Sequence, residues 1–176
     1  MRIIAGKFKS RRLKTLKGDQ TRPSSDRLKE AMFNQLGPYF EKGTFLDIFG
    51  GSGAVGLEAL SRGMDKVTFI EKNPKAAKII KENSKLLDVL EHITLQVGDV
   101  KRLLKTINEK YDIIFMDPPY EYQDIDTIVE MASNHLKENG WLIVETYKDV
   151  ELQVSKDLIQ KDVRYYGISK LHYQMP

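Results

Sequence analysis

Residues 44–56 of the chain read Thr-Phe-Leu-Asp-Ile-Phe-Gly-Gly-Ser-Gly-Ala-Val-Gly. The apolar run at 44–48 predicts a buried strand, and the segment from Ala54 onward predicts a helix that begins directly after the glycines. Within this strand–loop–helix unit, Gly51, Gly53 and Gly56 match the G-x-G-x-x-G pattern of nucleotide-binding α/β proteins. Glycines here let the backbone approach a ligand closely and adopt positive φ angles. We therefore expect a parallel sheet that binds a nucleoside cofactor at this loop.

Outside this unit, short apolar runs alternate with amphipathic segments, which predicts βαβ units and an α/β fold. Further strands are expected at 66–70, 92–97, 111–116 and 141–145. Helices are expected at 26–36, 54–61, 74–87, 100–107 and 125–136, the last of them ended by Gly140. The tail is expected to form a helix at 152–158, then two antiparallel strands at 162–166 and 168–173 that turn at Gly167. Two short strands are expected around residues 6–10, and the 26–36 helix is expected to cover the sheet or the cofactor site.

Composition limits the class of protein. The 176 residues, 41% hydrophobic and 30% charged, are typical of one soluble globular domain. The absence of cysteine from the sequence excludes a disulfide framework, a thiolate zinc site and a cysteine nucleophile. His92, His135 and His172 lack the spacing of metal ligands, so we expect no metal. No apolar run has the length of a membrane span, and residues 1–6 are charged too early for a signal peptide, so a cytoplasmic monomer is expected.

Charge divides the chain into two parts. Residues 1–42 hold 11 Lys or Arg and 4 Asp or Glu, a net charge of +7, whereas residues 43–176 hold 17 and 21, a net charge of −4. A basic segment on an acidic body is typical of a protein that grips phosphate groups, although a solvated basic face would have the same composition. We expect a basic N-terminal extension at 1–42, made of a hairpin and a helix, and a catalytic domain at 43–176, together forming one compact unit.

A second motif follows the expected strand at 111–116. Asp117-Pro118-Pro119-Tyr120 stops that strand, because two prolines can neither continue the ladder nor easily start a helix. The stop places a carboxylate, a fixed carbonyl and an aromatic ring at the carboxyl end of a strand, where open α/β sheets bind ligands. Asp117 and the Pro118 carbonyl can both accept from an NH2 group, and Tyr120 can stack on a flat base. The alternative is that the motif only ends the strand.

Acidic residues at three strand ends suggest which cofactor is bound. Asp47 could accept from the ammonium of an amino-acid tail, Glu71 from ribose hydroxyls, and Asp99 from an adenine amine. These contacts favour S-adenosylmethionine over NAD, because a carboxylate beside a pyrophosphate would repel it, and 176 residues leave no room for a dehydrogenase's substrate domain. Structural alternatives stay open: Asp47 could cap the glycine turn, Asp99 could cap a helix, and Glu71 could pair with Lys72.

The chain resembles the class I methyltransferases, and in particular the RsmD-type family that methylates guanine N2 in 16S ribosomal RNA. The resemblance covers nearly the whole length. It is carried by residues 1–6, Thr21-Arg22-Pro23, Asp26-Arg27, 30–34, the loop at 47–53 and 117–120. Family members usually have Thr at the position of Ser24 and often Arg at that of Lys29, so fine details of the N-terminal contacts could differ here.

The resemblance implies a Rossmann-like fold with a seven-stranded, mostly parallel sheet, the last strand antiparallel, and helices on both faces. It also implies a partly assembled small ribosomal subunit as substrate. The expected catalytic residues are Asp117, Pro118, Pro119 and Tyr120. The expected cofactor-binding residues are Asp47, Phe49, Gly50, Gly51, Ser52, Gly53, Glu71, Lys72, Asn73, Asp99 and Val100. The expected RNA-binding residues are Arg2, Lys7, Lys9, Arg11, Arg12, Arg22 and Arg27.

Three rival functions remain at this level. An adenine N6 methyltransferase of nucleic acid uses a closely related tetrapeptide, and a protein glutamine methyltransferase uses an Asn-Pro-Pro-Tyr version. A non-enzymatic RNA-binding assembly factor could also have kept the fold. The complete tetrapeptide, together with acidic residues at three strand ends, favours an enzyme, because a pure binding protein has no use for that combination. The choice of guanine N2 over adenine N6 rests on the resemblance alone.

Overall fold

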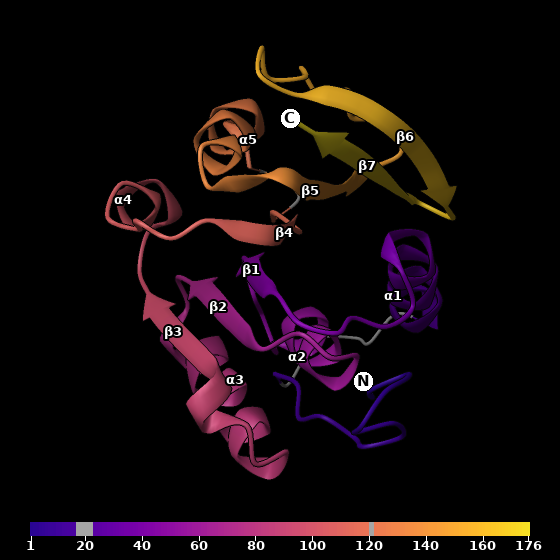
Figure 1. Ribbon diagram of the computed structural model, residues 1–176, viewed down its shortest axis with the longest axis vertical. Coiled ribbons are helices and arrows are strands. Elements are labelled where there is room, and N and C mark those ends of the chain that lie inside the picture. Colours follow the sequence, from indigo (N-terminus) through magenta and orange to yellow (C-terminus); the bar gives the residue numbers. More distant parts are fainter. Residues whose placement is uncertain (17–22, 120–121) are drawn as a thin grey trace.

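The computed structural model describes residues 1–16, 23–119 and 122–176. These residues form a seven-stranded sheet in the order β3–β2–β1–β4–β5–β7–β6 (Figure 1). The strands are β1 (Thr44–Ile48), β2 (Lys66–Glu71), β3 (Ile93–Val97), β4 (Tyr111–Met116), β5 (Leu136–Tyr147), β6 (Ile159–Tyr166) and β7 (Ser169–Met175). The strand β7 lies between β5 and β6 and runs antiparallel to both, whereas the other pairs are parallel. The expected mostly parallel sheet with an antiparallel last strand is confirmed.

Helices cover both faces of the sheet, as expected. They are α1 (Pro23–Leu36), α2 (Ala54–Ser61), α3 (Pro74–Leu86), the 3-10 turn η1 (Leu90–His92), α4 (Val100–Leu104) and α5 (Ile125–Ser133). Figure 1 shows α1, α2 and α3 on one face and α4 and α5 on the other. The first face buries a cluster in which Phe33 of α1 stacks on Phe45 of β1, with 6.3 Å between ring centroids. The second face buries Val100 and Ile128 against the other side of the strands. Within the described ranges, no helix is long and apolar enough to cross a membrane.

Gly140 does not end a helix, and the expected helix at 125–136 is too long. The helix α5 stops at Ser133, and Gly140 lies inside the long strand β5. A Cβ on Gly140 would come within 3.0 Å of the Tyr111 carbonyl oxygen, where the register between β4 and β5 shifts. The glycine therefore permits a close approach of two strands at an irregular pairing, a role that a glycine in a strand often has.

The helix expected at 152–158 is absent, and the helix expected at 100–107 is shorter than expected. Residues 152–158 form an irregular loop. Leu152 and Leu158 of this loop pack into the core beneath α4 and α5. The Gln153 amide donates a hydrogen bond to Asp126 of α5. The helix expected at 100–107 ends at Leu104. In both places the apolar residues serve tertiary packing rather than a continuous helical face.

Residues 1–16, here called the N-terminal hairpin, pack along α2 and contain no regular strand. Their one isolated bridge joins Arg2 and Arg12 in antiparallel fashion, in place of the two strands expected around residues 6–10. The amides of Ile4 and Ala5 donate to the carboxylate of Glu58 at 2.8 and 3.0 Å. Farther along, the hairpin reaches the end of α2, where the Lys7 amide donates to the Ser61 carbonyl at 2.7 Å. The hairpin is thus built onto the body of the protein.

The carboxylate of Glu58 lies at the centre of a buried charge network. Its oxygens lie 2.8 Å from Nε of Arg62 and 3.4 Å from Nζ of Lys29, and all three side chains are at most 2% exposed. Lys29 also donates to the Arg2 carbonyl at 2.7 Å. Burial is the main reason that the pKa of Lys29 is lowered, and the nearby Glu58 opposes that effect. Lys29 is therefore a structural residue that joins α1, α2 and the hairpin. The division at residue 42 stays a proposal.

Candidate active site

The candidate site lies where β1 and β4 end side by side. Ile48 is the register partner of both Ile70 and Met116, so the segments that follow β1, β2 and β4 leave the sheet at the same level. Glu71 pairs in turn with Val97 at the end of β3. The chain leaves β1 toward β2 on one side, whereas β4 lies on the other, which is the switch point where α/β sheets bind ligands. Acidic residues far apart in sequence are thereby brought to one edge.

The glycine loop after β1 is held in an unusual backbone conformation. Phe49 has a φ of 65°, which is uncommon for a residue with a side chain, and its amide and that of Gly50 both donate to the Ile70 carbonyl. Gly51 and Gly53 have φ angles of 56° and 78°. A Cβ on Gly56 would lie 2.4 Å from the ring of Phe69, so this glycine allows α2 to pack closely on β2. The fingerprint therefore has the structural context that it requires.

Glu71 fastens the glycine loop from the end of β2. Its Oε2 accepts from the Gly51 amide at 2.8 Å, and its Oε1 accepts from the Asn73 amide at 2.7 Å. Asn73 caps α3 by accepting from the Lys75 amide at 2.9 Å. Among the described residues, Glu71 forms no ion pair with Lys72, which is exposed, so the alternative pairing of these two residues is absent. Each carboxylate oxygen keeps a further acceptor position, so the ribose contact stays a prediction that the geometry permits.

Asp47 is buried beneath the glycine loop. It is 2% exposed, and its Oδ2 accepts from the Gly56 amide at 2.9 Å. Burial raises the pKa of Asp47 to about 8, the Gly56 amide opposes this, and the charge of Glu71 adds to it. The turn-capping role that was left open for Asp47 is present in the structure. A cation placed beside the carboxyl would favour its charged form, so the predicted ammonium contact remains chemically sensible.

Asp99 follows β3 and caps α4, since its Oδ1 accepts from the Arg102 amide at 3.1 Å. Its side chain is exposed, whereas Val100 is buried in the α4 and α5 core. The capping role that was left open for Asp99 is thus present as well. The predicted contact with an adenine amine stays a prediction, and Val100 could line the site only through its backbone.

The tetrapeptide after β4 lies beside the glycine loop. Asp117 is exposed, Pro118 is buried and Pro119 is exposed, while Tyr120 lies outside the described residues. The exposed carboxylate follows directly after Met116, the register partner of Ile48, so it leaves the sheet next to the start of the glycine loop. Asp117, the stiff Pro118 and the glycine loop, which is predicted to bind the cofactor, are the groups that a methyl transfer to an amine needs close together.

Tyr122 is a site residue that the sequence did not reveal. Its amide donates to the Pro119 carbonyl at 2.9 Å, and its ring packs edge to face on Phe49 with 5.3 Å between centroids. Burial is the main reason that the pKa of Tyr122 is raised. Only its position, two residues after the tetrapeptide, could have drawn attention to it. The contact links the glycine loop to the segment that follows the tetrapeptide.

Asn83 was also missed. It is fully buried on α3, where its Oδ1 accepts from the Lys14 amide at 2.8 Å and its Nδ2 donates to the Lys14 and Ser52 carbonyls at 3.0 and 2.9 Å. The signal was a polar residue on the otherwise apolar face of an amphipathic helix. Asn83 fastens the end of the N-terminal hairpin to the glycine loop.

The expected RNA-binding residues fall into two groups. Lys7 and Lys9 lie at the tip of the hairpin, next to Ser61 at the end of α2, about 12 Å along that helix from the glycine loop. Arg2 and Arg12 lie on the part of the hairpin nearer Lys14, which Asn83 joins to that loop. The other expected residues are Arg11, which is exposed, Arg27, which is exposed on α1, and Arg22, which lies outside the described residues.

Comparison with known proteins places this geometry in context. Residues 1–175 match the model of the family described as Conserved hypothetical protein 95. YlbH of Bacillus subtilis, named provisionally as an rRNA methyltransferase, is 37% identical over 96% of this chain and 95% of the relative. Ribosomal RNA small subunit methyltransferase D of Haemophilus influenzae is 36% identical over 86% of this chain and 81% of the relative. The solved structure of yhhF from Escherichia coli, described provisionally as a methyltransferase, has a TM-score of 0.86 with 26% identity, covering 99% of this chain and 96% of that one.

Proposed function

We propose that this chain is a methyltransferase that modifies the exocyclic N2 amine of a guanine in 16S ribosomal RNA. The chain belongs to the Cons_hypoth95 family, and its relatives include proteins named ribosomal RNA small subunit methyltransferase D. The observation that carries the proposal is the register of β1 with β4. It sets Asp117 beside the glycine loop, so an amine acceptor and a nucleoside cofactor would meet at one edge of the sheet.

S-adenosylmethionine is the cofactor that the residues fit. The glycine loop offers close backbone approach, Glu71 keeps acceptor positions for a ribose, and Asp47 is a buried carboxyl whose charged form lacks a counter-ion among the ion pairs of the described residues. An amino-acid ammonium would supply that counter-ion. The bound cofactor supplies an electrophilic methyl group. We propose that Asp47, Glu71, Asp99 and the loop at 49–53 hold it.

The protein's own groups then have to make a poor nucleophile react. The lone pair of the guanine amine is delocalised into the ring. We propose that Asp117 and the Pro118 carbonyl accept its two hydrogens, which localises the lone pair and stabilises the positive charge that develops on nitrogen. Asp117 would then accept the proton that the nitrogen must lose once it carries the methyl group. Tyr120 would stack on a base that has been turned out of its helix.

The relatives' names support ribosomal RNA as the class of substrate. We further propose that the RNA is presented in a partly assembled small subunit, that the protein acts as a monomer, and that it works in the cytoplasm, where that substrate is. These points rest on the family resemblance. No metal takes part in the proposed reaction.

One experiment separates the candidate functions. The protein is incubated with isotopically labelled S-adenosylmethionine and, in parallel, with unmethylated small subunits, naked 16S ribosomal RNA or DNA, and the modified nucleoside is identified. We expect N2-methylguanine in RNA. N6-methyladenine, or label in protein, would replace the proposal with one of its rivals, and binding of RNA without any transfer would favour an assembly factor.

A further inference from the structure

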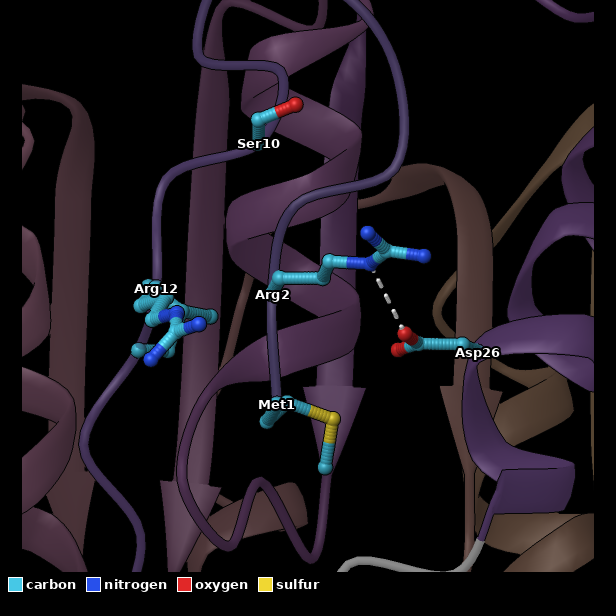
Figure 2. Close-up of a pocket in the computed structure, with 6 residues that line it drawn as sticks. Met1, Arg2, Ser10, Arg12 and Asp26 are labelled. Atoms are coloured by element: carbon cyan, nitrogen blue, oxygen red, sulfur yellow. Dashed lines mark hydrogen bonds and ion pairs between the residues drawn. The ribbon is translucent and has the colours of Figure 1, made fainter.

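The N-terminal hairpin and the first turn of α1 enclose a pocket of about 420 Å³. It is lined by Met1, Arg2, Ser10, Arg12, Leu13 and Asp26. Figure 2 shows the side chains of Arg2 and Arg12 on neighbouring segments of the hairpin, Ser10 at one end of the pocket and Asp26 reaching in from the helix. Its volume lies in the range of about 300–1,000 Å³ that is usual for pockets that bind small ligands or ligand groups.

The charges in this pocket are not balanced. Arg2 and Arg12 are partners in the antiparallel bridge, so their side chains leave the hairpin on the same face and directly opposite each other, an arrangement of like charges that is destabilising by itself. Asp26 neutralises one of them, since its Oδ2 lies 3.2 Å from Nε of Arg2. The other N–H donors of Arg2 are not used by that contact. Arg12 has no ion pair among the described residues. Among the side chains that line the pocket, that of Arg12 therefore keeps a positive charge without an acidic partner in the described residues.

We propose that this pocket binds a phosphate group of the RNA backbone, held between Arg2 and Arg12. The inference rests on the proposed function for its choice of RNA. Guanidinium groups present planar forks of donors that suit phosphate oxygens, and two of them facing one space can hold a single phosphate from both sides. The Ser10 hydroxyl adds a neutral donor at the rim. One phosphate would relieve the repulsion between the arginines, and the Asp26 carboxylate keeps Arg2 in position.

The location of the pocket gives the phosphate contact a purpose. Arg12 is two residues before Lys14, whose backbone is bonded to Asn83, and Asn83 is bonded to the Ser52 carbonyl in the glycine loop. A phosphate held by Arg12 is thus connected, through the backbone of Lys14 and the buried side chain of Asn83, to the loop that would hold the methyl donor. Contacts of this kind fix the register of a nucleic acid without reading its sequence. The pocket would set how far the target base lies from the cofactor.

Two variants that each remove one positive charge test the inference. Arg12→Gln removes a charge from the pocket, whereas Lys161→Gln removes one from the edge strand β6, where Lys161 is exposed and does not line the pocket. Binding of 16S ribosomal RNA is measured at several salt concentrations, and methyl transfer to small subunits is measured alongside it. For Arg12→Gln we expect a five- to twenty-fold weaker RNA affinity, a matching rise in KM and a salt dependence shallower by about one phosphate contact, a slope change of about 0.7–0.9. Lys161→Gln should show at most a twofold change, from long-range charge alone.

A third variant reverses the sign within the pocket. Ser10 has a φ of 69°, a conformation that aspartate tolerates better than most residues, so Ser10→Asp should fold and place a carboxylate where the phosphate is expected. It should weaken RNA binding at least as much as Arg12→Gln, and melting curves confirm that each variant is folded. Equal effects of Arg12→Gln and Lys161→Gln, or normal binding by folded Ser10→Asp, would overturn the pocket while leaving the methyltransferase assignment intact. Absence of methyl transfer by the wild type would overturn the assignment, and the binding comparison would still decide the pocket.

Discussion

The rings of Phe49 and Tyr122 pack edge to face, with 5.3 Å between their centroids and 66° between their planes. Phe49 begins the glycine loop and Tyr122 follows the tetrapeptide that we propose to be catalytic, so the contact couples two loops that would have to stay aligned for transfer. Lys101 and Asp124 add an ion pair of 2.6 Å between α4 and the same second loop. The two halves of the candidate site are therefore fastened to each other at their ends, beyond the pairing of β1 with β4.

The aromatic contact should matter for alignment. Tyr122→Leu removes the edge-to-face packing and should lower kcat by about tenfold, since small misplacements of reacting groups are costly. Tyr122→Phe keeps the ring and should remain within about twofold of the wild type, because only the hydroxyl is lost. Steady-state kinetics of methyl transfer for the two variants, with cofactor affinity measured by calorimetry, make the comparison. Equal activity of the two variants would show that the ring is not needed.

Asp117 is expected to act in the chemical step. Asp117→Asn retains the size of the side chain but loses the charge that would stabilise the developing cation, so turnover should fall by about 100-fold or more. The affinity for the cofactor should change little, because the cofactor residues lie on the other loops. Single-turnover transfer and calorimetric binding of the cofactor check both parts. A variant that transfers methyl at near the wild-type rate would eliminate the proposed role of this carboxylate.

Asp47 should make the stability of the free protein depend on pH. Its folded-state pKa is raised to about 8 from an ordinary value of 3.8, so between these values the folded protein binds more protons than the unfolded chain. The contribution of Asp47 to the free energy of unfolding is therefore largest below pH 3.8 and is lost as the pH rises toward 8. Asp47→Asn stays neutral and can still accept from the Gly56 amide. Its melting temperature relative to the wild type should rise steadily between pH 5 and pH 8, as measured by thermal unfolding without cofactor.

A constant difference between the two proteins across that range would contradict the buried, protonated carboxyl. A matched control is Asp65→Asn, because the Asp65 carboxylate accepts from the Gly43 amide at an exposed position. That variant should show no comparable trend with pH. The comparison separates the effect of burial from the effect of removing a carboxylate.

The buried charge network around Glu58 should contribute strongly to the free energy of unfolding, because it joins α1, α2 and the N-terminal hairpin. Glu58→Gln leaves Lys29 and Arg62 buried without a counter-charge and should cost about 3–5 kcal/mol, the usual result of breaking a buried ion pair on one side. Glu82→Gln, which breaks the solvent-exposed pair with Lys14, should change stability far less. Urea unfolding of both variants measures the difference. Similar losses for the two would mean that the buried charges are compensated in another way.

The parts of the fold that follow from local rules could be predicted from the sequence. The strand β1, the glycine loop and α2 were placed correctly because an apolar run, glycines and a helical segment each act over a few neighbouring residues. The hairpin of β6 and β7 was recognised from alternation around Gly167, which has a φ of 63°. The strand ends that carry Glu71, Asp99 and Asp117 were placed close together by the same reasoning about parallel sheets.

What could not be predicted depends on contacts between distant segments. Gly140 resembles a helix terminator, and only its closeness to the Tyr111 carbonyl explains its place within β5. Leu152 and Leu158 resemble part of a helix, but they lie in a loop and pack into the core beneath α4 and α5. The net charge of residues 1–42 also does not show which basic side chains are exposed to solvent, and Lys29 is buried. The local patterns of Asn83, a polar residue on an apolar helix face, and of Tyr122, which lies two residues after the tetrapeptide, do not reveal the distant segments that these residues contact.

The placement of the N-terminal hairpin has a consequence for biosynthesis. Its first backbone partner on α2 is Glu58 and its last on α3 is Asn83, which is 69 positions beyond Lys14 in the chain. Residues 1–16 are made before any of these partners exist, so they cannot reach their final position until synthesis has passed α3. Closing so long a loop carries an entropic cost that only the completed contacts repay. Residues 1–16 are therefore translated before their partners and are among the last to take their final position.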